Sequence, residues 1–166
     1  LKCASAKINA FADNEDPWGM TVEGFNDKLG EFTLLSKEKA NAFNGYPKET
    51  LENVRVIENG AVRLKIQAIF GYSNSFAVVT YTLPKNGDYI DIKIKMLSND
   101  SSRFYKLSFN TTLENPEFYG QTAFGREKLR ADGNEAVYQK WCGISDGKKS
   151  LAIINKGTYG GSVDGN

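Results

Sequence analysis

Four side chains in this sequence could recognise a sugar, because each offers a flat face or a forked hydrogen-bond donor. They are Trp18, Tyr119, Arg126 and Tyr159. The indole of Trp18, within the segment DPWG, could stack on a sugar ring and donate one hydrogen bond. Arg126 follows a glycine, so a turn could direct its guanidinium toward a ligand. The alternatives are a Trp18 packed beneath the rim of a sheet and a surface ion pair between Arg126 and an acid such as Glu127.

Acidic residues offer a second kind of chemistry. A glycosidase needs two carboxyl groups placed across a sugar, but the spacing of the 20 Asp and Glu residues singles out no pair. The segment DNEDPWG (13–19) is rich in side-chain oxygens, as calcium loops are. It lacks the glycine and the distal glutamate of that motif. We interpret it as an acidic surface turn, and we predict no catalytic residue and no metal site in this chain.

The chain contains no histidine, which excludes several mechanisms. A Ser-His-Asp triad, a Cys-His dyad and a zinc site built on imidazole all require that side chain. Cys3 and Cys142 stand far apart without a second cysteine nearby, so two free thiols are favoured over a disulfide. No glycine-rich phosphate-binding motif is present either. We therefore expect no cofactor bound by this chain.

Composition and charge limit the classes of partner that this chain is expected to bind. The 166 residues carry 21 Lys and Arg against 20 Asp and Glu, without a basic block, so a nucleic-acid partner is not expected. No apolar run approaches the roughly 20 residues needed to span a bilayer. We expect a soluble chain with no membrane partner. The sequence shows no targeting segment and leaves the compartment open.

The elements that would position these side chains are strands. Apolar and polar residues alternate in AVRLKIQAIF (61–70) and YIDIKIKM (89–96), and more briefly around Tyr105, Leu107 and Phe109. Asn-Gly pairs at 59–60 and 86–87 favour tight hairpin turns, in which positive φ angles are needed. These signals predict a meander of three or four antiparallel strands.

Other segments complete the expected fold. The segment LLSKEKANAF (34–43) has a weak helix-start signal, and we interpret it as strand or irregular structure. Near the C-terminus we predict a strand ending at Cys142, a turn through Asp146 and Gly147, and a buried run, Leu151 to Ile154. Trp141 and that run should face the core together. The sequence thus predicts one all-β domain over residues 1–166, an antiparallel β-sandwich.

Several motifs, taken in order, resemble a known family. They are DPWG, ENGAVRLKIQAIFGYSNS, GDYIDIKIKM, RFYKLSFN, YGQTAFGREKLR and YQKWCGISDGKKSLAIINKGTYGGSV. Their order is similar to that of the C-terminal β-domain of family 38 glycoside hydrolases, the α-mannosidases. The resemblance covers the chain from about Asp13 onward. It implies part of a galactose-mutarotase-like supersandwich, and a chain that is a fragment of a larger multidomain glycosidase.

The resemblance also implies that catalysis belongs to a different domain of the full enzyme. The full enzyme would hydrolyse α-mannosides with a zinc ion and an aspartate nucleophile that belong to its N-terminal catalytic domain, which would be the intramolecular partner of this chain. No residue here can be matched to that machinery. We expect the fragment to be inactive alone, and to support the catalytic domain or contact carbohydrate. If the fragment ends inside a larger fold, it should leave a sheet edge open and tend to self-associate.

Two alternatives remain at this stage. The first is a stand-alone carbohydrate-binding module, with a sugar platform made by Trp18, Tyr119, Arg126 or Tyr159. The second is an unrelated structural sandwich. Binding of mannose oligosaccharides by the chain would support the first, and a parent reading frame without a metal-binding hydrolase segment would support the second.

Overall fold

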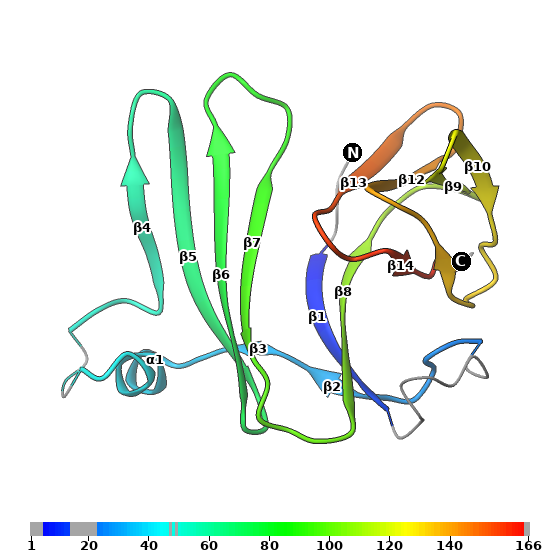
Figure 1. The fold of residues 1–166 in the computed structure, drawn as a ribbon. Coiled ribbons are helices and arrows are strands. Elements are labelled where there is room, and N and C mark those ends of the chain that lie inside the picture. The colour runs from blue at the N-terminus through cyan, green and yellow to red at the C-terminus, as the bar shows by residue number, and fades with distance from the viewer. Residues whose placement is uncertain (1–4, 14–22, 47, 49, 165–166) are drawn as a thin grey trace. The chain divides into compact units, whose positions relative to one another are not determined.

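The computed structural model describes residues 5–13, 23–46, 48 and 50–164, and the chain divides into two compact units (Figure 1). Unit 1 contains residues 1–7, 11–28 and 104–166, and unit 2 contains residues 8–10 and 29–103. Three strands form a sheet of order β2-β1-β8, namely β1 (Ser5–Ala12), β2 (Lys28–Glu31) and β8 (Arg103–Asn110). Residues of each of these strands are assigned to both units. That the chain forms a single domain stays a prediction.

Unit 2 contains a meander of long antiparallel strands. Its elements are β3 (Thr33–Leu34), α1 (Lys37–Phe43), β4 (Val54–Asn59), β5 (Arg63–Tyr72), β6 (Ser75–Pro84) and β7 (Asp91–Leu97). Antiparallel pairing joins β3 and β4 to β5, β5 to β6, and β6 to β7. The predicted meander and both predicted hairpins, β4–β5 and β6–β7, are therefore confirmed.

The register explains why alternation was a reliable signal in this sheet. Ile66 pairs with Tyr81, and Tyr81 pairs with Ile92, so apolar side chains share one face across three strands. The other face carries Lys65 opposite Thr82, one residue along each strand. Because successive side chains point to opposite faces, one strand in register fixes the faces of its neighbours.

The hairpin turns differ from the prediction. Among the described residues, neither Asn-Gly pair adopts a positive φ, so these are not primed two-residue turns. The β4–β5 connection spans 60–62 and the β6–β7 connection spans 85–90, so neither needs a left-handed residue. The backbone N–H of Lys85 instead donates to the carbonyl of Val62 at 2.8 Å, which joins the two connections.

The segment 34–43 was predicted to be strand or irregular, and this was wrong: it contains the helix α1. Ser36 caps the helix, because its hydroxyl accepts a hydrogen bond from the Lys39 N–H at 3.2 Å. Leu35 and Ala40 pack with Ile69 of β5 in a small core. Tertiary packing and the cap thus stabilise a helix that the local sequence pattern predicts only weakly.

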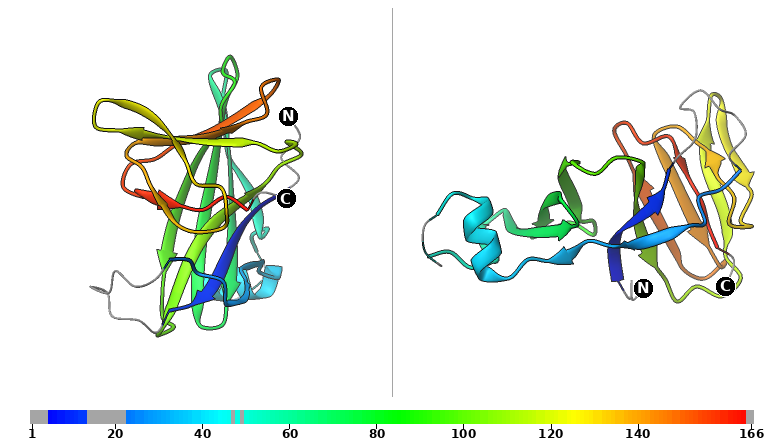
Figure 2. Two further views of the ribbon diagram at one scale, coloured as in Figure 1. Left: turned by 90° about the vertical axis from the view of Figure 1, so that its right-hand side faces the viewer. Right: turned by 90° about the horizontal axis from the view of Figure 1, so that it is seen from below.

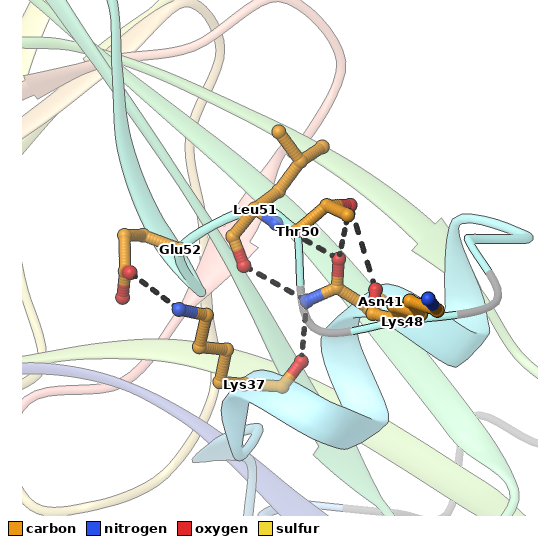
Figure 3. A network of polar contacts seen from close by, with 6 residues as sticks. All are labelled: Lys37, Asn41, Lys48, Thr50, Leu51 and Glu52. Atoms are coloured by element: carbon orange, nitrogen blue, oxygen red, sulfur yellow. Dashed lines mark hydrogen bonds and ion pairs between the residues drawn. The ribbon is translucent and has the colours of Figure 1, made fainter.

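Asn41 holds the following loop onto this helix (Figure 3). Its side chain is 2% exposed and donates to the carbonyls of Lys37 and Leu51 at 2.7 and 2.8 Å. Its amide oxygen accepts from the Leu51 N–H at 3.0 Å and from the Thr50 hydroxyl at 3.4 Å. A buried amide with both ends bonded fixes α1 and its loop as one piece.

Unit 1 contains two hairpins joined into one sheet. Its elements after β8 are β9 (Glu117–Thr122), β10 (Gly125–Leu129), β11 (Ala136–Val137), β12 (Trp141–Ser145), β13 (Ser150–Ile154) and β14 (Gly160–Gly161). The sheet has the order β10-β9-β12-β13, and β11 pairs with β14. Figure 2 shows β14 on one side of this sheet. The core on that side consists of Phe118, Ala136, Tyr138 and Cys142.

Two predictions near the C-terminus need correction. The strand does not end at Cys142, because β12 begins at Trp141 and continues to Ser145. The run from Leu151 is not buried throughout, since Ile154 is 83% exposed. Trp141 pairs with Ile154 and shares its face, away from the core. The predicted turn is confirmed: Gly147 has a φ of 82°.

Cys142 is a free, buried thiol, as predicted, whereas Cys3 lies outside the described part of the chain. No helix in that part is long and apolar enough to cross a membrane.

Candidate functional site

The candidate site is the face of the β10-β9-β12-β13 sheet that points away from the unit 1 core. Phe118 and Cys142 point into the core, so their neighbours along the strands point outward. We call this surface the Tyr119 face. It consists of Glu117, Tyr119, Gln121, Arg126, Lys128, Trp141, Gly143, Ser145, Ser150, Ala152 and Ile154.

Four side chains of the β9–β10 hairpin form a contact network on this face. The Tyr119 hydroxyl donates to Glu117, and the Lys128 ammonium donates to the other Glu117 oxygen at 2.6 Å. The Arg126 guanidinium carbon lies 5.2 Å from the centre of the Tyr119 ring, a cation–π contact. Arg126 therefore lies over the Tyr119 ring, and Tyr119 itself is partly exposed.

The electrostatics of this network keep its groups in their ordinary ionisation states at neutral pH. The hydrogen bond from Lys128, followed by that from Tyr119, lowers the pKa of Glu117. The same contact with Glu117 raises the pKa of Tyr119. Since Glu117 stays a carboxylate and Tyr119 a phenol, the network offers hydrogen-bonding and stacking groups rather than an acid or a nucleophile.

The structure brings two of the four predicted sugar-contacting residues together. Tyr119 and Arg126 are neighbours on the Tyr119 face. Tyr159 precedes β14, and its carbonyl accepts from the Tyr138 N–H at 3.0 Å, so it lies on the core side of the sheet. Trp18 lies outside the described residues. Sugar binding by these residues stays a prediction.

Three charged or aromatic members of this face, Glu117, Lys128 and Trp141, were not predicted from the sequence to lie there. The signal for the first was present, because alternation in EFYGQT places Glu117 on the same face as Tyr119. Lys128 could be found only from the register, which sets it opposite Tyr119. Trp141 was assigned to the core because it is large and apolar, yet its strand turns it outward.

A second cluster in unit 1 surrounds Lys106 of β8. Its ammonium lies 5.5, 5.6 and 5.9 Å from the ring centres of three phenylalanines, Phe11, Phe25 and Phe104. It forms an ion pair with Glu135 and donates to the Ser162 hydroxyl at 3.0 Å. The Lys106 and Glu135 side chains are only 16% and 22% exposed. Because two protein acceptors and three aromatic rings surround the largely buried ammonium, we interpret this cluster as structural.

The residues that the structure describes do not form a zinc site. The sequence has no histidine, and the described residues contain no group of three potential metal ligands. Zinc sites in proteins use three or four nitrogen, sulfur or carboxylate ligands around one point. The acidic segment 13–19 lies, apart from Asp13, outside the described residues, so its interpretation as a surface turn stays a prediction.

The fold and this face define an antiparallel β-domain with a polar and aromatic outer surface. Comparison with known families gives a match over residues 12–166 to the model described as "Glycosyl hydrolases family 38 C-terminal domain". The chain therefore belongs to this family of domains, as the ordered motifs predicted. The match and the antiparallel sheets confirm the all-β sandwich class. No curated protein and no solved structure matches the chain.

Proposed function

We propose that this chain is the non-catalytic β-domain of a zinc-dependent α-mannosidase-like enzyme, whose chemistry is carried by another domain. The observation that supports this most is the match to a C-terminal domain family over nearly the whole chain. A sequence without histidine agrees with it, because neither imidazole-bound zinc nor an imidazole base can be built here. The domain supports its catalytic partner within the same polypeptide.

The test is an activity assay with the chain and with the polypeptide encoded by the complete reading frame. Both are incubated with an aryl α-mannoside and zinc, with and without a chelator. We expect zinc-dependent hydrolysis by the complete protein and none by the 166-residue chain. Hydrolysis by the chain, or an inactive complete protein that is folded and zinc-loaded, would overturn the proposal.

A second role is supported by the Tyr119 face, and this is contact with carbohydrate. Tyr119 is partly exposed and offers an aromatic ring for stacking, and Arg126 lies next to that ring as a donor. Trp141 is partly exposed on the same face. An aromatic surface with charged and hydroxyl groups around it suits a neutral, hydroxyl-rich ligand.

Calorimetry with mannose oligosaccharides tests this role. Tyr119→Ala removes the stacking surface and should abolish the binding heat. Tyr159→Ala is the matched control, because it removes an exposed tyrosine from the other side of the same sheet and should leave binding unchanged. Absence of binding by the folded wild-type chain would exclude the role. Equal loss in both variants would exclude this face as its site.

A further inference from the structure

A shallow groove lies on the polar face of the unit 2 sheet, near the β4–β5 and β6–β7 connections. Its volume is about 330 Å³, at the small end of the range for ligand sites. Seven side chains line it: Ile57, Arg63, Lys65, Thr80, Thr82, Asp91 and Lys93. All belong to unit 2, and they come from four neighbouring strands.

Strand register explains why these groups meet. Lys65 pairs with Thr82, and Thr82 pairs with Asp91, which forms one polar row across three strands. Thr80 pairs with Lys93 in the next row. A shift of register in β4 between Val56 and Glu58 places Glu58 opposite Lys65. The polar face is thus built by cross-strand pairs rather than by a flexible loop.

Cations outnumber acids in the groove. Arg63 donates through Nε to one Glu58 oxygen at 2.6 Å, and Lys65 lies 2.9 Å from the other. The Glu58 carboxylate therefore pairs with two cations, and the terminal nitrogens of Arg63 take no part in that contact. Lys93 makes no ion pair with any described residue. Asp91 is the single acid among the lining side chains and opposes an anion there.

Hydroxyl groups add donors between the cations. The Thr80 hydroxyl oxygen accepts from the Gln67 amide at 3.3 Å, which leaves its own proton available. Gln67 in turn accepts from Arg55 at 2.6 Å, so this row of the sheet is oriented by hydrogen bonds. A site with guanidinium, ammonium and hydroxyl donors in one depression has the chemistry that recognises a tetrahedral oxyanion.

We propose that this groove binds a phosphate or sulfate group, either as the free ion or as an ester on a sugar. Arg63 and Lys93 supply the charge, and Thr80 and Thr82 supply neutral donors between them. Asp91 stands at the same place and limits the affinity. The proposal does not depend on the proposed function, because it concerns unit 2 alone and needs no catalytic partner.

Nuclear magnetic resonance titration of the isotope-labelled chain tests this site. The ligands are inorganic phosphate, sulfate, a hexose 6-phosphate and the unmodified hexose, at constant ionic strength with chloride as reference. We expect saturable shifts at Lys65, Thr80, Thr82 and Lys93 with the oxyanions and none with the hexose. Tighter binding of the hexose phosphate than of phosphate would assign the ligand to a sugar ester, and equal binding to the free ion.

Charge variants make the test specific. Lys93→Gln should weaken oxyanion binding about tenfold, because it removes the cation that makes no ion pair within the described part of the chain. Asp91→Asn should strengthen binding several-fold, since it removes the opposing charge. Lys148→Gln, in the β12–β13 turn of unit 1, is the matched control and should have no effect. No saturable shift in the wild type, or equal weakening by Lys148→Gln, would overturn the proposal.

Discussion

At the scale of the residue, Lys106 shows how a charge can be kept inside a small β-domain. An ammonium group that leaves water loses several kcal/mol of hydration unless other groups replace it. Here Glu135, Ser162 and three aromatic rings replace it. Phe25 and Phe104 also stack on each other, with ring centres 4.2 Å apart. The cluster connects segments that are far apart in the sequence.

Lys106→Met should destabilise the chain by about 3 kcal/mol, because Glu135 would be left largely buried without its partner. The figure lies at the low end for buried pairs because both side chains retain some exposure. Urea unfolding followed by tryptophan fluorescence measures it.

The double variant Lys106→Met, Glu135→Leu should recover part of that loss, since no charge then remains unpaired. Lys128→Met is the control, because Lys128 is 62% exposed and its ion pair with Glu117 lies at the surface. If the single and double variants were equally unstable, packing rather than the charge would explain the effect.

At the scale of the element, a single glycine allows the β9 strand to lie close to its neighbours. A Cβ atom on Gly120 would lie 2.5 Å from a Leu129 methyl carbon and 2.7 Å from the Tyr138 Cβ. Tyr138 belongs to the unit 1 core, and Leu129 packs against that core. The absence of a side chain at Gly120 is therefore what lets Tyr138 pack against the sheet.

Gly120→Ala should destabilise the chain by about 1–3 kcal/mol through overpacking. Gly125→Ala, on the paired strand β10, is the matched control because its Cβ would meet no atom within 4 Å. It should be neutral or slightly stabilising. Thermal unfolding of both variants measures the difference, and equal melting temperatures would contradict the close packing around Gly120.

The strands of unit 2 could be predicted from the sequence, whereas the helix α1 and the Lys106 cluster could not. Alternation predicted the strands of unit 2 because each face repeats across several paired strands. It could not predict α1, which is seven residues long and depends on Asn41 and on packing against Ile69. It also could not predict the Lys106 cluster, because nothing local in the sequence signals contacts between β1, β8 and Glu135.

The candidate site was predicted only in part, because residue types can be read from the sequence but contacts between strands cannot. Tyr119 and Arg126 could be named from their types, but their contact depends on the diagonal placement that the β9–β10 register creates. Trp141 was assigned to the core because large apolar residues are usually buried. Its pairing with the exposed Ile154 shows that strand geometry, rather than residue type, decides which face a side chain occupies.

At the scale of the whole molecule, the ionisable groups predict how stability changes with pH. Hydrogen bonds from Arg63 and Lys65 lower the pKa of Glu58, and one from Ser75 lowers that of Asp100. Carboxylates of this kind stabilise the folded chain above their unfolded pKa values, near 4.5 and 3.8, and the effect is lost as the pH falls through the folded values. At high pH the direction reverses, because burial raises the pKa of Cys142 and of Tyr138.

We therefore expect a broad plateau of stability between about pH 5 and 8, since the chain has no histidine to titrate there. Stability should fall below about pH 4.5, and again above about pH 9, where the unfolded chain loses protons that the folded chain retains. Urea unfolding across this range measures the profile. A step in stability near pH 6.5 would contradict it.

The division of β1 between two units has a consequence for synthesis of the chain on the ribosome. Unit 2 is complete in sequence once Arg103 has emerged, because its other segment, Ile8–Ala10, is made first. Residues 11–28 of unit 1 cannot pack with the rest of that unit until the segment from Phe104 onward has been synthesised. During that interval Phe11 and Phe25 have no Lys106 to surround. Translation pauses after residue 104 would thus extend the time in which early aromatic residues stay open to chaperones or to misfolding.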